Sequence, residues 1–328
     1  VSNITFTNYE KGISAGTSTE NFDFTVSGCT FHGNSTGLEI SGGSASVRDG
    51  SVFTGNQTGI LINGATGVSI VSSFIGVNSD GSTGAGNTTG ISIESSSEDT
   101  TIGGDGDGNV IGRNDTGILI TGSGTSGNQV LGNYIGTNSS DDDIGNTSSG
   151  ILINDGAISN TVGSSASPNI ISRNGNGIIV SDTGTSNNEV LGNYIGTNSG
   201  SDDIGNTGPG VTLQSGASSN TIGTSDARNT ISANSIGILL RNASTTGNRI
   251  LSNNIGTADL GNETYGIHAA SSTLTIIGSA TNSNIIVSNA SGGILFEKSD
   301  VNFVVNNYIG VDENLDASTN PQDFGISF

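Results

Sequence analysis

The stretch Asn128-Gln-Val-Leu-Gly-Asn-Tyr-Ile-Gly-Thr-Asn138 returns further along the chain as Asn188-Glu-Val-Leu-Gly-Asn-Tyr-Ile-Gly-Thr-Asn198. The interval from Asn128 to Asn188 also separates Asn109-Val-Ile-Gly-Arg-Asn114 from Asn169-Ile-Ile-Ser-Arg-Asn174, and that segment from Asn229-Thr-Ile-Ser-Ala-Asn234. A fixed period of this kind is typical of a repeat protein, in which each unit packs only on its neighbours. The repetition therefore decides the fold class.

A shorter unit lies inside the long one. It consists of a Gly followed by an apolar-x-apolar strand, and it begins at Gly12, Gly37, Gly59, Gly90, Gly117, Gly150, Gly177, Gly210, Gly237, Gly266, Gly293 and Gly325. We therefore expect 12 coils. Between Gly117 and Gly237 a long spacing, as from Gly117 to Gly150, alternates with a shorter one, as from Gly150 to Gly177. We expect the extra residues of the long coils in one loop, at 137–145.

Each coil contains three short strand-like segments, for example Asn220-Thr-Ile-Gly, Asn229-Thr-Ile-Ser and Gly237-Ile-Leu-Leu. Three strands per turn predict an all-β, right-handed parallel β-helix with three parallel sheets, forming a single domain over residues 1–328. A β-propeller would need longer blades, and a leucine-rich repeat would show helical stretches. We find no amphipathic helical pattern in the sequence.

Side-chain alternation along a strand predicts which residues form the core. The two apolar residues after each Gly should point inward: Ile118 and Ile120, Ile151 and Ile153, Ile178 and Val180, Val211 and Leu213, Ile238 and Leu240. The Asn columns, represented by Asn114, Asn174 and Asn234, should lie at turns where each side-chain amide bonds to the same position one coil away. Ligand binding is the alternative role for these columns.

The composition restricts the partners. A net charge of −21 with only 8 Lys and Arg residues disfavours nucleic acid and anionic membrane surfaces. An acidic surface binds divalent cations or keeps an exported protein soluble. The single cysteine, Cys29, cannot form an internal disulfide. The chain lacks Met and any membrane-length apolar run, so we expect a processed or excised product that does not insert into a membrane.

The combined pattern of Asn-Thr-Ile-Gly, Asn-x-Ile-Ser-x-Asn, Gly-Ile-x-Ile and Asn-x-Val-x-Gly-Asn-Tyr-Ile-Gly-Thr resembles the pectate-lyase-like β-helix repeats of large exported bacterial and archaeal surface proteins. The resemblance covers nearly the whole chain. It implies the fold and an extracellular or cell-surface location. It implies no single function, because the superfamily includes polysaccharide lyases, hydrolases, epimerases, phage tailspikes, adhesins and structural proteins.

The catalytic sets of that superfamily are not visible in the sequence. Its lyases pair carboxylate-bound Ca²⁺ with an Arg or Lys base, and its hydrolases cluster Asp residues with a His, whereas His32 and His268 here lie in distant coils. Asp155 and Asp182 occupy equivalent positions in adjacent coils, which could suit a retaining glycosidase, but turn formation explains them more simply. No aromatic platform for sugars is evident. We therefore predict no catalytic and no cofactor-binding residue, and a protein that is not an enzyme.

Calcium is the one cofactor that the sequence suggests. Gly103-Gly-Asp-Gly-Asp-Gly-Asn109 approaches a Gly-Gly-x-Gly-x-Asp calcium motif but has Gly108 in place of an Asp. The candidate ligands, drawn from this segment and from two acidic loops, are Asp105, Asp107, Asn109, Asp141, Asp143, Asp202 and Asp203.

Two classes of function are compared. The regular repeat, without one elaborated loop cluster, favours a non-enzymatic extracellular structural protein that self-assembles into a surface filament, sheath or layer. The alternatives are a polysaccharide-binding or polysaccharide-cleaving protein and a tailspike-like viral fibre. The expected partners are accordingly other copies of the chain, with a surface polysaccharide as a further candidate.

Two surfaces are predicted to mediate self-association. The residue between the inward pair faces outward and is often aliphatic, as in Leu119, Leu152, Ile179, Leu239 and Leu295, which predicts a lateral contact unless a long loop covers the stripe. The ends show strand pattern without a cap, which predicts end-to-end stacking through Val1, Ile4, Ile326 and Phe328. The alternative is that the chain was cut from a longer β-helix.

Overall fold

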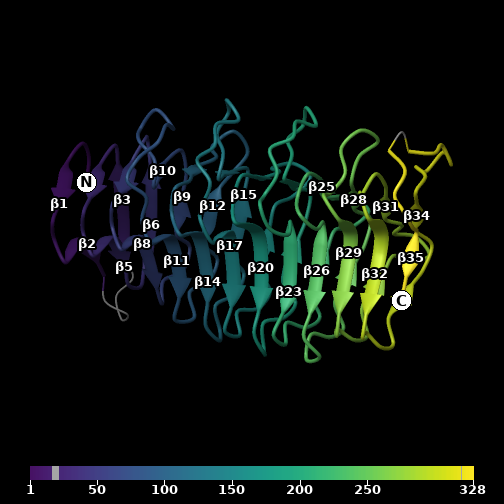
Figure 1. Ribbon diagram of the computed structural model, residues 1–328. Helices are drawn as coiled ribbons and strands as arrows, with labels where there is room; N and C mark the ends of the chain where they lie inside the picture. Colours follow the sequence, from purple (N-terminus) through teal and green to yellow (C-terminus); the bar gives the residue numbers. More distant parts are fainter. Residues whose placement is uncertain (17–21, 319) are drawn as a thin grey trace.

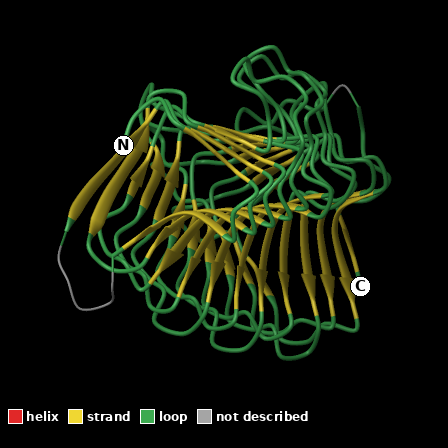
Figure 2. Cartoon of the chain, turned by 90° about the vertical axis from the view of Figure 1, so that its left-hand side faces the viewer, coloured by secondary structure: helices red, strands yellow, loops and turns green. Residues whose placement is uncertain are grey.

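The computed structural model describes residues 1–16, 22–318 and 320–328, and within these ranges the chain consists of β-strands and turns (Figure 1). The strands form three parallel sheets that the chain visits in the repeating order B, C, A. Viewed from the N-terminal end, the three sheets enclose a common interior (Figure 2). This is a right-handed parallel β-helix, and it confirms the predicted all-β fold class.

The strand bounds are as follows. Sheet B has 12 strands in the described ranges: β1 (Thr5–Thr7), β4 (Thr30–His32), β7 (Val52–Thr54), β10 (Phe74–Ile75), β13 (Val110–Ile111), β16 (Tyr134–Ile135), β19 (Ile170–Ile171), β22 (Tyr194–Ile195), β25 (Thr230–Ile231), β28 (Asn254–Ile255), β31 (Ile285–Ile286) and β34 (Tyr308–Ile309). Sheet C also has 12 described strands: β2 (Lys11–Ala15), β5 (Thr36–Ile40), β8 (Thr58–Asn63), β11 (Thr89–Glu94), β14 (Thr116–Thr121), β17 (Ser149–Asn154), β20 (Asn176–Ser181), β23 (Val211–Gln214), β26 (Ile238–Arg241), β29 (Tyr265–Ala270), β32 (Gly292–Glu297) and β35 (Ile326–Ser327). Sheet A has 11 in the same described part: β3 (Asp23–Ser27), β6 (Ser44–Arg48), β9 (Ser69–Ile70), β12 (Thr101–Gly103), β15 (Gln129–Leu131), β18 (Thr161–Val162), β21 (Glu189–Val190), β24 (Thr221–Ile222), β27 (Arg249–Ile250), β30 (Ile276–Ile277) and β33 (Phe303–Val304).

The strands of sheet C are the Gly-marked strands of the sequence, so the predicted number of coils is confirmed for the described chain. Their register aligns equivalent residues of successive coils, as in Ile118 with Ile151 and Ile151 with Ile178. All ten residues predicted to point inward are fully buried. They belong to one continuous apolar cluster that runs through the coils. Each buried side chain of this size stabilises the fold by about 1.5–3 kcal/mol relative to exposure.

Buried asparagine ladders line all three corners between the sheets. At the B–C corner the ladder residues are Asn34, Asn56, Asn87, Asn114, Asn146, Asn174, Asn206, Asn234, Asn262 and Asn289. At the C–A corner they are Asn128, Asn160, Asn188, Asn220 and Asn248, and at the A–B corner Asn109, Asn133, Asn169, Asn193, Asn229, Asn253, Asn284 and Asn307. Within each ladder the Nδ2 of every asparagine except the last donates to the Oδ1 of the asparagine one coil further along, which is the arrangement predicted for the Asn columns.

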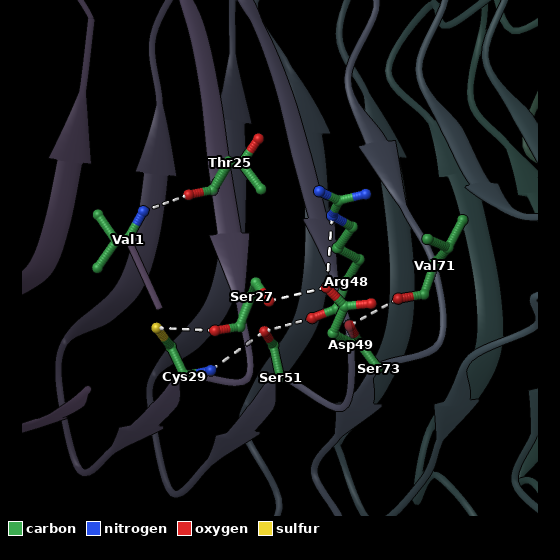
Figure 3. A network of polar contacts seen from close by, with 9 residues as sticks. All are labelled: Val1, Thr25, Ser27, Cys29, Arg48, Asp49, Ser51, Val71 and Ser73. Carbon is green, nitrogen blue, oxygen red and sulfur yellow. Dashed lines mark hydrogen bonds and ion pairs between the residues drawn. The ribbon is translucent and has the colours of Figure 1, made fainter. Parts of the chain in front are cut away.

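Toward the N-terminus, serine and cysteine replace asparagine in the A–B ladder, as Figure 3 shows. Ser73 donates its backbone N–H to Asn109 Oδ1 at 3.0 Å, and Ser51 and Cys29 hold the corresponding position in the two preceding coils. The Cys29 N–H donates to Ser51 Oγ at 3.4 Å, and its thiol donates to the Ser27 carbonyl at 3.6 Å. Cys29 is therefore a buried corner residue of the ladder.

Two rows of loops flank the outer face of sheet B. The B–C loops are 76–88, 136–148, 196–210, 256–264 and 310–325, apart from residue 319, and the A–B loops are 104–109, 163–169, 223–229 and 278–284. The B–C loops project along one side of the rod (Figure 1). Each of the long central coils contains a B–C loop, which confirms the predicted place of the extra residues.

The B–C loops return to the ladder through a glycine. A Cβ added at Gly145 would lie 2.0 Å from the Arg173 carbonyl oxygen, and one at Gly205 would lie 1.9 Å from the Ala233 carbonyl oxygen. Only a residue without a Cβ permits this close approach to the next coil. The Ile-Gly-Asn return therefore fixes where each loop rejoins the corner.

Candidate functional site

The outer face of sheet B carries a continuous row of side chains. Most sheet B strands pair one outward residue with one inward residue, as in Tyr134 and the fully buried Ile135. The register aligns the outward residues, all half-buried, into what we call the sheet B row: Phe74, Val110, Tyr134, Ile170, Tyr194, Thr230, Asn254, Ile285 and Tyr308. Four aromatic residues, Phe74, Tyr134, Tyr194 and Tyr308, lie in this row, an alignment that the count of aromatic residues in the sequence did not indicate.

The aromatic side chains of the row recur at every second strand. Phe74, Tyr134 and Tyr194 are each separated by one intervening strand, which carries Val110 or Ile170. Two strand spacings correspond to about 10 Å along the rod. Large aromatic and smaller aliphatic side chains therefore alternate along the face.

The B–C loops form a wall beside this row and are joined to one another. Asn138 Nδ2 donates to the Gly81 carbonyl at 3.1 Å, and Asn198 Nδ2 donates to Asp141 Oδ2 at 3.0 Å. Asn138 also accepts the N–H of Asp142 at 3.2 Å, which closes a turn inside its own loop. The first three loops are thus held in a defined geometry along the rod.

Two hollows lie along the same face. One has a volume of about 330 Å³ and is lined by Tyr134, Asp105 and Pro168 among others. The other has a volume of about 340 Å³, lies between loops 256–264 and 310–325, and is lined by Asn254, Ile285, Asp312 and Asp316 among others. We call the latter the C-terminal hollow. Both are large enough for a small polar ligand or a sugar unit.

The residues around the C-terminal hollow break the repeat. Arg228 stands where the preceding repeats have Pro168 and Gly108, and its Nη1 donates to Asn254 Oδ1 at 3.3 Å. Asn254 stands where Tyr194 stands one double coil earlier. The hollow therefore has an amide where the preceding repeat has a tyrosine, and a guanidinium contacts that amide.

Asp312 is a second departure from the repeat. It stands where the earlier loops have Asn138 and Asn198, and its Oδ1 accepts the N–H groups of Asn314 and Asp316 at 2.8 and 3.0 Å. A carboxylate replaces an amide, so this turn acquires a group that can hold or release a proton. The hollow is thus lined by the carboxylates Asp312 and Asp316 and the amide of Asn254, to which Arg228 donates.

The predicted calcium ligands are not brought together. Asn109 is fully buried in the A–B ladder, where its Oδ1 accepts the Ser73 N–H, and its selection as a ligand is therefore corrected. Asp105 and Asp107 are exposed in loop 104–109, and Asp141, Asp143, Asp202 and Asp203 lie in two B–C loops. Among the described residues no group of three or more His, Cys, Asp or Glu side chains is arranged to hold a metal ion.

The other polar candidates lie at separate places. Asp155 and Asp182 have positive φ angles of 51° and 76°, which confirms that they are turn residues. His32 lies on β4 of sheet B, 3.1 Å from Thr54 Oγ1, whereas His268 lies on β29 of sheet C, 3.3 Å from Glu297 Oε2. The two histidines are thus in different sheets as well as in distant coils.

The predicted association surfaces have mixed exposure. Leu119, Leu152, Ile179, Leu239 and Leu295 lie in register on the outer face of sheet C and are half-buried. No described segment crosses these strands in Figure 1. Val1, Ile4, Ile326 and Phe328 are exposed at the two ends of the described chain. Association through either surface stays a prediction.

The fold and its repeats define a pectate-lyase-like right-handed parallel β-helix. The profile of a family described as "Periplasmic copper-binding protein (NosD)" matches residues 1–155. No curated protein matches the chain. Among the described residues no helix is long and apolar enough to cross a membrane.

Several solved structures resemble the chain. A mutant of the periplasmic alginate epimerase AlgG has a TM-score of 0.48 and 16% identity, over 84% of this chain and 60% of that one. The A-module of the Azotobacter vinelandii mannuronan C-5 epimerase AlgE6 has a TM-score of 0.45 and 14% identity, over 86% and 68%. A GH87 α-1,3-glucanase catalytic domain in complex with tetrasaccharides has a TM-score of 0.33 and 10% identity, over 100% and 62%. This chain thus spans about 60% of the length of the first of these proteins.

These comparisons correct one prediction. All three proteins are, by their names, enzymes that act on polysaccharides, and this finding overturns the expectation that the chain is not an enzyme. At these identities and TM-scores the likeness assigns no reaction and no residue role to this chain.

The copper in the matched family's description does not fit the side chains present. Copper sites use imidazole, thiolate and thioether ligands. Here the chain has no Met, Cys29 is buried in a ladder, and His32 and His268 lie in different sheets. Cys29, His32 and His268 therefore do not form a set of copper ligands.

Proposed function

We propose that this chain is a polysaccharide-active β-helix protein that works outside the cytoplasm and binds a glycan along the sheet B row. The row itself carries the proposal, because aromatic and aliphatic side chains lie in register on one outer face between two rows of loops. Aromatic faces pack against the C–H faces of sugar rings, and nearby polar groups bind the hydroxyls. The periplasmic description of the matched family supports the location.

We place the chemical step at the C-terminal hollow. Asp312 and Asp316 are carboxylates at its wall, and Arg228 reaches Asn254 on its floor. A carboxylate can take a proton from a sugar or give one to a leaving oxygen, and a guanidinium stabilises negative charge that develops nearby. Hydrolysis, elimination and epimerisation all use these groups, so the product identifies the reaction.

The test is to incubate the protein with neutral and acidic polysaccharides, with and without Ca²⁺. New reducing ends indicate hydrolysis, ultraviolet-absorbing unsaturated ends indicate elimination, and changed sugar signals in NMR spectra indicate epimerisation. We expect Asp312→Asn and Asp316→Asn to lower the rate at least about a hundredfold. Asp155→Asn is the matched control, because Asp155 is a turn carboxylate at the far edge of sheet C, and it should retain full activity. A chain that neither binds nor alters any polysaccharide would contradict the proposal.

A further inference from the structure

We infer that the glycan bound along the sheet B row is neutral and repeats every two sugars, as a β-1,4-linked glucan or mannan does. This inference rests on the proposed function and adds the class of substrate. Three features of the face support it: the spacing of the aromatic residues, the residues between them and the charges of the loops.

The spacing of the aromatic residues fits a two-sugar repeat. Phe74, Tyr134 and Tyr194 are two strands apart, which is about 10 Å along the rod. In an extended β-1,4-linked glucan or mannan, successive sugars are turned over, so the same face of the ring recurs once per disaccharide. The length of that disaccharide is close to the separation of neighbouring aromatic residues. One sugar face would therefore meet an aromatic ring in every repeat.

The intervening residues fit the other sugar of each pair. Val110 and Ile170 lie between the aromatic residues and are smaller and aliphatic. A sugar turned to its opposite face presents its bulkier substituents to the protein and needs more room there. The alternation of large and small side chains thus matches the alternation of sugar faces, and a face of uniform side chains would not.

The charges favour a neutral chain over a polyuronate. The sheet B row contains no charged residue. Every one of these B–C loops carries at least one acidic residue, and loops 104–109 and 223–229 add Asp105, Asp107 and Asp226. Arg228 is the one Lys or Arg in these loops, and Arg113 and Arg173 lie in the short B–C turns between them. A polyuronate laid between these loops would be repelled along most of its length, most strongly at low salt. A neutral glycan meets no such repulsion.

The experiment is calorimetric titration of the full chain with cellohexaose, mannohexaose and hexamers of alginate and polygalacturonate, at low salt without Ca²⁺. We expect one or both neutral hexamers to bind, and both uronate hexamers to bind at least about tenfold more weakly. Tyr134→Ala and Tyr194→Ala should each weaken binding of the neutral hexamer about two- to tenfold, whereas Tyr134→Phe should not. Leu119→Ala, on the outer face of sheet C, is the matched control and should leave binding unchanged.

The outcomes separate the two proposals. Uronate hexamers that bind as tightly as the neutral ones without Ca²⁺ would overturn the substrate class and leave the proposed function standing. Equal losses in Tyr134→Ala and Leu119→Ala would overturn the placement on sheet B. If no hexamer and no polysaccharide binds, the proposed function itself fails. Circular dichroism of each variant, compared with the unsubstituted chain, identifies any loss of binding that follows from misfolding.

Discussion

Asn174 Nδ2 donates a hydrogen bond of 3.1 Å to Oδ1 of Asn206, the residue at the same corner one coil further along. Asn174 in turn accepts both the backbone N–H and the Nδ2 of Asn146, at 3.1 and 2.8 Å. Its Nδ2 also donates to the Ile135 carbonyl at 3.0 Å. One amide thus satisfies buried groups in three successive coils.

Asn174→Ala should destabilise the chain by about 2–4 kcal/mol, because it leaves buried donors and acceptors in both neighbouring coils without partners. The measurement is the midpoint of denaturant unfolding followed by circular dichroism. Asn154→Ala is the control, since Asn154 points outward on β17 and its Oδ1 has no hydrogen-bond partner. Similar shifts in the two variants would show that the ladder hydrogen bonds do not stabilise the fold.

Asn254→Tyr should strengthen the binding of long neutral oligosaccharides. Asn254 lies two strands from Tyr194 and two strands from Tyr308, at a position where the spacing of the row would place an aromatic residue. A tyrosine there would make aromatic residues recur at every second strand from Phe74 to Tyr308. We expect about a two- to tenfold gain for chains long enough to reach from Tyr194 to this position, and none for disaccharides. Calorimetry with a length series of oligosaccharides measures the gain. An equal gain at every length would argue against binding of the sugar chain along the aromatic residues spaced two strands apart.

Arg228→Gln should lower the rate of the proposed reaction at the C-terminal hollow. The substitution removes the guanidinium that donates to Asn254 Oδ1, and Asn254 lines the hollow together with Asp312 and Asp316. A loss of charge stabilisation at a reacting centre costs roughly tenfold to a thousandfold in kcat. The control is Arg249→Gln, which removes an exposed arginine from sheet A. A full rate in Arg228→Gln would exclude this residue from the chemistry.

Stability in acid should depend on Glu39. Burial alone would raise the pKa of Glu39, but the Lys11 ammonium and the hydroxyls of Ser41 and Ser14 outweigh it and hold the pKa below the ordinary value. The hydrogen bond and charge of Glu39 raise the pKa of Lys11 in return. A lowered carboxyl pKa stabilises the fold above the unfolded-state pKa, and this stability is lost as the pH falls through the lowered pKa.

Glu39→Gln should therefore reduce thermal stability near neutral pH and flatten its decline in acid. Thermal unfolding at a series of pH values measures both effects. At alkaline pH the sign reverses for Lys11, because stability from a raised pKa is lost as the pH rises through that pKa. An unchanged acid profile in Glu39→Gln would mean that the Lys11–Glu39 pair contributes no pH-dependent stability.

Replacing Leu119, Leu152 and Ile179 with Asp tests the lateral contact predicted from the sequence. These side chains lie in register on the outer face of sheet C, so three carboxylates there would repel a second copy. Sedimentation velocity of the unsubstituted chain should show association that the triple variant lacks. An unsubstituted chain that remains monomeric at every concentration would make the prediction wrong.

Much of the fold could be predicted because its signals recur in every coil. The Gly-Ile-x-Ile strands and the corner asparagines each appear many times, so chance matches were excluded by repetition. The sheet B row was missed because aromatic residues were considered by their total number. Their position immediately before an inward Ile, as in Asn-Tyr-Ile-Gly, would have shown Tyr134 and Tyr194 to be aligned and outward.

The C-terminal hollow was missed for a different reason. Arg228 and Asn254 lie in neighbouring coils, and their contact depends on the register between those coils. A single residue that departs from the repeat cannot be distinguished in the sequence from ordinary variation between repeats. Their common place on one face appears only when the coils are stacked, and the same stacking removed Asn109 from the predicted calcium ligands.

Because long and short coils alternate, the structural repeat of the rod is a pair of coils. In its central part the B–C loops lie on every second coil, the A–B loops on the coils between them, and the aromatic residues of sheet B recur once per pair of coils. One such pair has the length of chain from Asn128 to Asn188. Inserting or deleting a whole pair would preserve the asparagine ladders, the alternation of both rows of loops and the two-strand spacing of the aromatic residues. A single coil, long or short, would preserve the core but bring loops of the same kind onto adjacent coils. Duplication in whole double coils is thus the route by which such a molecule can change its length and keep the sheet B row and its flanking loops in register.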